Sequence, residues 1–166
     1  YNVFRGFGLQ RFQIRVNNRK ILTGFYAMQQ LSEKSGDIMR TVDKLDKIGP
    51  QKVREILITD CALTEAQADE ILRFIAITGT NSQVIEALEG YAGRNEIFDK
   101  GLEELKAVTR NLAAFGVPEE NFAVDLTIAR GLDYYTGTVY ETTLLDHPQI
   151  GSVCSGGRYD NLAGYY

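Results

Sequence analysis

Two short segments near the C-terminal end of the sequence concentrate residue types that can carry chemistry. The first segment, residues 130–141, holds an arginine, an acid, two adjacent tyrosines and several glycine or threonine residues. The second segment, residues 154–160, holds two glycines, an arginine and a tyrosine. A simple core strand carries far fewer polar groups. Because a short turn separates the two, we predict that they form an antiparallel hairpin and line the two halves of one small-molecule pocket.

Arg130 is the residue of the first segment best suited to bind an anion. A guanidinium held at the start of a strand binds two oxygens of a phosphate or carboxylate at once. Its positive charge can also stabilise charge that develops in a phosphoryl or adenylyl transition state. Gly131 leaves room for the backbone to approach closely. The spacing alone leaves a structural salt bridge to an acid such as Asp133 equally open.

Three tyrosines and two glycines complete the predicted pocket. Tyr134 and Tyr135 are neighbours, so in a strand they point to opposite faces, and one hydroxyl can reach a ligand while the other side chain packs. Gly156 and Gly157 allow the backbone to come near a ligand or to form a bulge that interrupts the strand. Tyr159 then lies beside the same site. Packing in the core or at its rim is the commoner role of tyrosine and stays an alternative.

Other polar residues have simpler interpretations. We expect Thr138 and Glu141 at exposed strand positions, His147 in a surface turn, and Cys61 and Cys154 as small buried residues. The two cysteines lie far apart and make neither a disulfide framework nor a zinc site, so a reducing cytosol is the default and no metal is expected. The sequence holds no P-loop, dinucleotide fingerprint or serine nucleophile elbow, so an enzyme would rely on electrostatics and positioning.

The composition is that of a globular protein. No apolar stretch approaches the roughly 20 residues that span a bilayer, and no signal peptide is recognisable, so we expect no membrane contact. The net charge of −4 argues against a whole-surface affinity for nucleic acid, although a local contact stays open.

The elements that position the two segments divide the sequence into three parts. Residues 1–41 contain an alternating strand followed by an amphipathic helix. Residues 42–116 are almost wholly helical, with one helix ending at Gly49 and the next beginning at Pro50. Residues 117–166 change to strands, rich in β-branched and aromatic residues. This order predicts an α+β fold that carries a helical insertion.

Capping residues mark where the helices begin. Thr64 with Gln67 forms the pattern of a capping box. The predicted caps are Asn17 or Asn18, Thr64 and Asn81, and the last helix is predicted from about Asn95 to Phe115. The predicted strands of the last part are residues 122–126, residues 138–145 and a return strand from residue 150.

The two segments closely resemble, in order, the two histidine-binding motifs of histidyl-tRNA synthetases. Residues 12–22 are similar to a strand-to-helix segment of that family, and residues 42–49 are similar to the start of its insertion. The resemblance covers essentially the whole chain in collinear order. It identifies the chain as an internal fragment of the catalytic core together with the insertion domain.

The resemblance implies a class II core: a partial antiparallel sheet with flanking helices, plus an all-helical insertion domain. Core residues would be 1–41 and 117–166, and the insertion would be 42–116. The full-length protein would be a cytoplasmic homodimer that activates histidine with ATP, accompanied by Mg²⁺, to histidyl-adenylate. It would then transfer histidine to tRNA(His), which the insertion would contact.

The resemblance also implies a role for each residue of the predicted pocket. Arg130 would be the catalytic arginine, in contact with the α-phosphate and the histidine carboxylate. Tyr134 and Tyr135 would belong to the histidine-binding strand, with one hydroxyl towards the imidazole. Tyr159 would line the other side of the pocket, and the two glycines of the second segment would let the backbone close over the ligand.

Several parts of the family pattern are missing from this sequence. They are the upstream dimer and ATP-binding motifs, the loop with an acidic partner for the imidazole, the last class motif and the anticodon-binding domain. We therefore expect that this piece alone does not aminoacylate and binds no cofactor by itself. Two alternatives stay open: a non-catalytic paralogue, the regulatory subunit of ATP phosphoribosyltransferase, and a synthetase-like tRNA-sensing domain. Both tend to lose the first motif, which is intact here.

Overall fold

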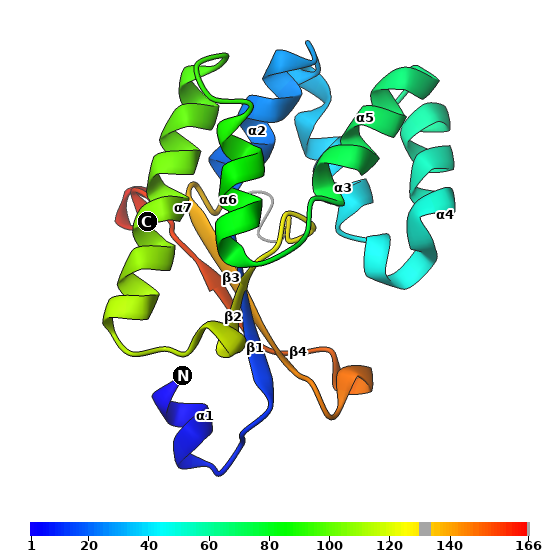
Figure 1. The fold of residues 1–166 in the computed structure, drawn as a ribbon. Coiled ribbons are helices and arrows are strands. Elements are labelled where there is room, and N and C mark those ends of the chain that lie inside the picture. Colours follow the sequence, from blue (N-terminus) through cyan, green and yellow to red (C-terminus); the bar gives the residue numbers. More distant parts are fainter. Residues whose placement is uncertain (130–133, 166) are drawn as a thin grey trace.

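A four-stranded sheet forms the centre of the computed structural model, which describes residues 1–129 and 134–165 (Figure 1). The strand order is β2-β1-β3-β4. The strands are β1 (Phe12–Asn18), β2 (Phe122–Val124), β3 (Thr138–Leu144) and β4 (Ser152–Gly157). Pairing is antiparallel between β1 and β3 and between β3 and β4. The predicted α+β class is therefore confirmed.

The sheet is mixed rather than purely antiparallel, because β2 runs parallel to β1. Ile14 lies opposite Phe122 in this pair. A parallel pair needs a long crossover, and the whole helical block between the two strands supplies it. The outer edge of β2 is closed by Asn81, whose Nδ2 donates to the Phe122 carbonyl at 3.2 Å and whose Oδ1 accepts from the Val124 amide at 2.8 Å. One side-chain amide thus takes the place of a further strand.

Seven α-helices lie in the described residues, most of them between β1 and β2. They are α1 (Asn2–Gly6), α2 (Arg19–Met28), α3 (Ser35–Val42), α4 (Leu45–Thr59), α5 (Glu65–Ile75), α6 (Asn81–Glu89) and α7 (Glu96–Ala114). Short 3₁₀ turns cover Ser32–Lys34, Glu119–Asn121, Pro148–Ile150 and Leu162–Tyr165. Figure 1 shows α3, α4 and α5 gathered to one side of the molecule.

The predicted helix ends are largely confirmed. The capping box of Thr64 with Gln67 is present, and α4 is kinked at Gly49, whose φ of 78° is left-handed. Asn18 rather than Asn17 caps α2, because its side chain accepts from the Lys20 amide.

The predicted cap at Asn81 is wrong. Thr80 has the extended backbone of a cap, and its hydroxyl accepts from the Gln83 amide in a second capping box. Asn81 is the first helical residue and directs its amide to β2 instead.

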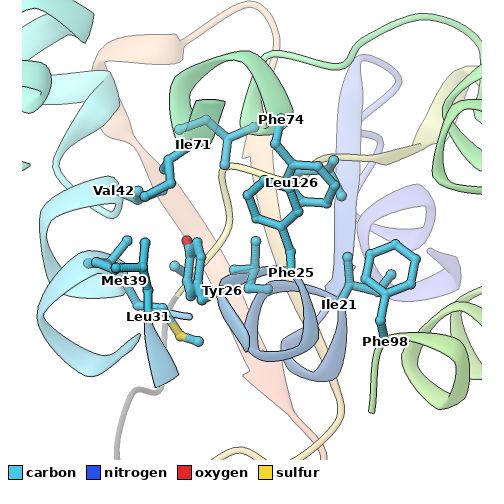
Figure 2. Close-up of a cluster of buried hydrophobic side chains, with 14 of the residues drawn as sticks. Ile21, Phe25, Tyr26, Leu31, Met39, Val42, Ile71, Phe74, Phe98 and Leu126 are labelled. Carbon is cyan, nitrogen blue, oxygen red and sulfur yellow. The ribbon is translucent and has the colours of Figure 1, made fainter. Parts of the chain in front are cut away.

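One hydrophobic core joins the helices to the sheet. Phe25 of α2 stacks on Phe74 of α5, with 3.8 Å between the ring centroids, and both lie in the buried cluster with Phe98 of α7 and Leu126 after β2 (Figure 2). This cluster draws residues from all three predicted parts of the chain. No helix among the described residues combines the length and apolarity that crossing a membrane requires.

Helices α2 and α7 touch along their backbones. A Cβ at Gly24 would lie 2.5 Å from the Phe98 amide nitrogen, and one at Gly101 would lie 2.7 Å from the Ile21 amide nitrogen. Side-chain atoms do not approach that closely, so only glycine fits at either position. This contact brings α7 against the start of α2 and, through it, against the end of β1.

Candidate functional site

The structure brings the first and second segments together at one end of β3 and β4. Strand pairing sets Tyr140 opposite Gly156 and Val139 opposite Gly157. Beyond the strands, the Thr136 amide donates to the carbonyl of Arg158 at 2.8 Å. The predicted antiparallel hairpin is confirmed. Residues 130–133, and with them the predicted anion-binding Arg130, lie outside the described residues.

Three tyrosines of the two segments form one cluster. The ring centroid of Tyr134 lies 4.4 Å from that of Tyr135 and 5.8 Å from that of Tyr159. Tyr134 is 46% exposed, whereas Tyr135 is less exposed. Burial, and after it the hydrogen bond with Tyr134, raises the pKa of the Tyr135 hydroxyl. The cluster therefore offers neutral phenol groups that can donate and accept hydrogen bonds near neutral pH.

The strand predicted from Thr138 does begin there, as β3. Tyr134 and Tyr135 precede it, so the strand position that the resemblance implied for them is wrong. The Gly137 carbonyl accepts from the Arg19 amide at 2.9 Å, so this stretch bonds to the start of α2 as well as to Arg158 of the second segment. The alternation of faces expected in a strand does not apply there. The rings of the two tyrosines contact each other instead.

The two glycines of the second segment make room for tyrosine rings. A Cβ at Gly157 would lie 2.6 Å from Cγ of Tyr135, and one at Gly156 would lie 2.5 Å from the hydroxyl of Tyr140. The predicted interruption of the strand is wrong, because β4 continues to Gly157. The irregularity in the β3–β4 ladder lies at Thr142 and Thr143, away from both glycines. Glycine is thus required by packing between the two segments.

The Asp160 carboxylate joins the second segment to the first. Arg158 Nε donates to Asp160 Oδ1 at 2.8 Å, and the Thr136 hydroxyl donates to Asp160 Oδ2 at 2.8 Å. The hydrogen bond from Arg158, followed by that from Thr136, lowers the pKa of the Asp160 carboxyl. The turn that carries Tyr159 is therefore held by side chains from both segments.

Residues of β1 hold the loop that leads into the first segment. Asn17 is fully buried, and its Nδ2 donates to the Ile128 carbonyl at 2.9 Å. Arg15 Nε donates to Asp125 Oδ2 at 2.7 Å, and the Asp125 carboxylate accepts from the Thr127 amide at 2.9 Å. Sequence reasoning treated Asn17 only as a cap and did not find these contacts, which join residues far apart in the chain.

Two residues of the hairpin differ from expectation. Glu141 is only 6% exposed, whereas an exposed position was predicted, because it faces Arg15 of β1 across the sheet. Cys154 is exposed, because it lies on the edge strand β4, whereas Cys61 is buried as predicted. His147 lies in an exposed turn, also as predicted. The described residues contain no group of three or more Asp, Glu, Cys or His side chains arranged to bind a metal ion.

The described residues also form a cavity away from the tyrosine cluster. A cavity of about 760 Å³ lies between α6 and α7, and its lining includes Ile85, Val117 and Phe122. Lys106 pairs with Glu89 at its rim. It contains none of the residues of the first or second segment. The tyrosine cluster remains the candidate site, because polar groups of two segments converge there and none of them lines the cavity.

Comparison with known proteins agrees with this arrangement. The sequence model of the histidyl-tRNA synthetase family matches residues 2–166. A histidine–tRNA ligase of Clostridium tetani is 49% identical over 166 residues, which are all of this chain and 37% of that protein. A histidine–tRNA ligase of Xanthomonas campestris is 44% identical over 173 residues, which cover 99% of this chain and 36% of that protein.

Solved structures give the same result. The crystal structure of histidyl-tRNA synthetase from Nostoc sp. PCC 7120 superposes with a TM-score of 0.94 at 41% identity, covering 98% of this chain and 38% of that one. The chain therefore spans a little over a third of the length of the relatives that it matches. These matches each cover at least 98% of this chain. The chain belongs to the histidyl-tRNA synthetase family.

Proposed function

We propose that the full-length protein containing this chain is a histidine–tRNA ligase. It activates histidine with ATP to histidyl-adenylate and then transfers histidine to tRNA(His). The observation that carries the proposal is the family match over residues 2–166, with both histidine-binding segments intact and in contact. We expect the 166-residue chain alone to be inactive, because it spans about 37% of its relatives.

The tyrosine cluster is the part of the chain that we assign to histidine. The hydroxyls of Tyr135 and Tyr159 would bond the imidazole, while Tyr134 supports the Tyr135 ring. A site built from fixed hydroxyls rejects apolar amino acids strongly, because those would leave buried polar groups unpaired. Gly156 and Gly157 would let the β4 backbone close against the ligand, beside the tyrosine rings that they already admit.

Arg130 is the group of this chain that we assign to the reacting phosphate. A guanidinium binds two oxygens at once and stays charged, so it can stabilise the charge that develops on the α-phosphate. The support for this role is its place in the first segment, directly after the loop that Asn17 anchors through Ile128. The proton and leaving-group steps are left to the parts of the protein that this chain does not contain.

ATP in such a reaction brings Mg²⁺ with it. The described residues offer no group of three or more carboxylate, thiol or imidazole side chains that could bind a metal ion by themselves. A Mg²⁺ ion that arrives with ATP would be held mainly by the phosphates and waters, with one or two carboxylates. Asp160, which follows Tyr159 in the second segment, is engaged by Arg158 and Thr136. We therefore assign no step of the reaction to a metal held by these residues.

The remaining parts of the proposal follow from the family. Residues 1–41 and 117–166 would belong to the catalytic core, and residues 42–116 would form the insertion that contacts tRNA. Arg54 of the insertion is paired with Asp69 and Glu65, so this arginine gives the tRNA contact no independent support. We propose a homodimer located in the cytoplasm, as expected for a synthetase of this class.

A regulatory role is the second candidate. A structure from Bacillus halodurans described as an ATP phosphoribosyltransferase regulatory subunit/histidyl-tRNA synthetase superposes with a TM-score of 0.79 at 21% identity. Likeness at that identity concerns the fold alone. The Clostridium tetani ligase, at 49% identity, is more than twice as similar in sequence.

Histidine-dependent exchange of pyrophosphate into ATP tests the proposal. We expect exchange by the full-length protein, none by the 166-residue chain, and a loss of about 10²–10³-fold in kcat for Arg130→Ala. A full-length protein that binds histidine but catalyses no exchange would be the regulatory paralogue, and the ligase proposal would be wrong.

A further inference from the structure

Glu104 is a carboxylate of α7 that lies beside both segments without belonging to either. It follows Gly101, the residue at which α7 touches the backbone of α2, by three positions, so both lie on the same face of the helix. The close contact at Gly101 is what lets a side chain as short as glutamate reach the end of β1. Sequence reasoning gave no signal for Glu104, because it is one of many acids on a helix.

Both oxygens of Glu104 are engaged at the junction of β1 and α2. Oε1 accepts from the Lys20 ammonium at 2.5 Å, and Oε2 accepts from Asn18 Nδ2 at 2.8 Å. Asn18 is fully buried, and its other side-chain atom, Oδ1, accepts from the Lys20 amide as the cap of α2. One carboxylate therefore orients the amide that ends β1 and begins α2.

The same carboxylate lies against the first segment. A Cβ at Gly137 would be 3.4 Å from Glu104 Oε2, so Gly137 packs directly on the carboxylate. The Gly137 carbonyl accepts from the Arg19 amide at 2.9 Å, and Thr138 pairs with Asn18 across β1 and β3. The position of Glu104 thus sets where the first segment enters the sheet.

The second segment meets Glu104 through Arg158. The Cδ of Arg158 would lie 3.2 Å from a Cβ at Gly137, so its side chain and the Glu104 carboxylate flank the same glycine. Burial alone would raise the pKa of Glu104, but hydrogen bonds from Lys20 and Asn18 and the charges of Lys20 and Arg158 together lower it. Glu104 is therefore ionised, and it attracts the arginine that precedes Tyr159.

Glu103, the neighbour of Glu104, has a different setting. Its carboxylate pairs with Lys100 on the solvent side of α7, with side-chain exposures of 70% and 56%. An exposed pair of this kind contributes little to stability. Glu104 is 17% exposed on its side chain and joins three parts of the chain. The two adjacent acids form a matched pair for experiment.

We propose that Glu104 is a positioning residue for the histidine site, acting from α7 through Asn18, Gly137 and Arg158. This inference rests on the proposed function. By fixing the entry of the first segment against Arg158, Glu104 sets the distance between Tyr135 and Tyr159, which would bind histidine from opposite sides. A displacement of about 1 Å in such a site costs about 100-fold in activity.

The test uses the full-length protein with Glu104→Gln, the matched control Glu103→Gln, and Lys20→Met as a second way to disturb the same contact. For each we would measure the histidine dissociation constant by calorimetry, KM for histidine and kcat in pyrophosphate exchange, and the thermal midpoint. We expect Glu104→Gln and Lys20→Met to raise the histidine dissociation constant and KM about tenfold or more. Glu103→Gln should stay within about twofold of the wild type.

Comparing the change in histidine affinity with the change in thermal midpoint distinguishes a positioning role of Glu104 from a merely structural one. A merely structural Glu104 would lower the thermal midpoint while the folded variant kept the wild-type histidine affinity, and that result would overturn the inference. If Glu104→Gln fails to fold, Lys20→Met gives the same decision. If the wild type binds histidine but catalyses no pyrophosphate exchange, the ligase proposal is wrong. The ratio of the histidine dissociation constants of Glu104→Gln and the wild type still tests the role of Glu104. A wild type that binds no histidine overturns both.

Discussion

The backbone contact between α2 and α7 makes a quantitative prediction about Gly101. A Cβ placed there would lie 2.7 Å from the Ile21 amide nitrogen and 2.9 Å from Lys20 Cβ. Replacing glycine by alanine inside a helix normally gains about 1 kcal/mol. Overpacking of a core normally costs about 1–3 kcal/mol, and here the nearest atom belongs to a backbone that no side-chain rotation can move away. We therefore take the upper end of that cost, about 3 kcal/mol, and expect Gly101→Ala to lose about 2 kcal/mol net of the helix gain.

Gly36→Ala on α3 is the matched control. Its nearest neighbour is Arg40 Nη2 at 3.4 Å, at the flexible end of a side chain. We expect this variant to gain up to about 1 kcal/mol. Urea unfolding of the 166-residue chain, followed by circular dichroism, measures both, and the thermal midpoint of Gly101→Ala should fall by about 4–8 °C. If Gly101→Ala is as stable as the wild type, the helices are not in backbone contact and the docking of α7 described above is incorrect.

Three further predictions concern single side chains. Tyr26→Phe should raise the free energy of unfolding by about 1 kcal/mol in urea titrations, because the buried Tyr26 hydroxyl has no hydrogen-bond partner among the described residues; a loss of similar size would show that a partner exists. Glu104 has a lowered pKa, so it stabilises the fold above the usual glutamate pKa and this stabilisation disappears as the pH falls through the lowered value. Urea midpoints of Glu104→Gln between about pH 6 and 3 should therefore fall less steeply than those of the wild type, and parallel curves would refute the shift. Thr80→Ala should cost about 1 kcal/mol in the same assay by removing the cap that holds the Gln83 amide, whereas an unchanged midpoint would assign the cap elsewhere.

Features that depend on neighbouring residues were predictable from the sequence. The capping box of Thr64 with Gln67 and the kink at Gly49 need only the local backbone, and both are present. Thr80 and Asn81 are adjacent and both are good capping residues, so the local sequence does not show which of them caps α6. The structure shows that it is Thr80. The Asn81 side chain instead forms hydrogen bonds with the backbone at the edge of β2, a contact between distant parts of the chain.

Features that depend on contacts between distant parts of the chain were not predictable. The parallel direction of β2 follows from the crossover through the helices, which strand composition does not reveal. The hydrogen bond from the Arg19 amide to the Gly137 carbonyl joins residues more than 100 positions apart. The roles of Asn17 and Glu104 exist only because the core places them beside loops far along the chain. The residue types of the two segments predicted the chemistry of the site. The contacts that hold these segments in place could not be predicted from the sequence.

Histidine binding by tyrosine variants of the full-length protein tests the central claim most directly. The claim is that phenol groups from two segments, brought together by β3 and β4, form the amino-acid site. Calorimetric titration should show that Tyr135→Phe and Tyr159→Phe each weaken histidine binding by about tenfold, as expected for one lost hydrogen bond to a polar ligand. Tyr91→Phe, in the aromatic cluster with Phe25 of α2, should bind like the wild type. Unchanged affinity in both site variants would contradict the account.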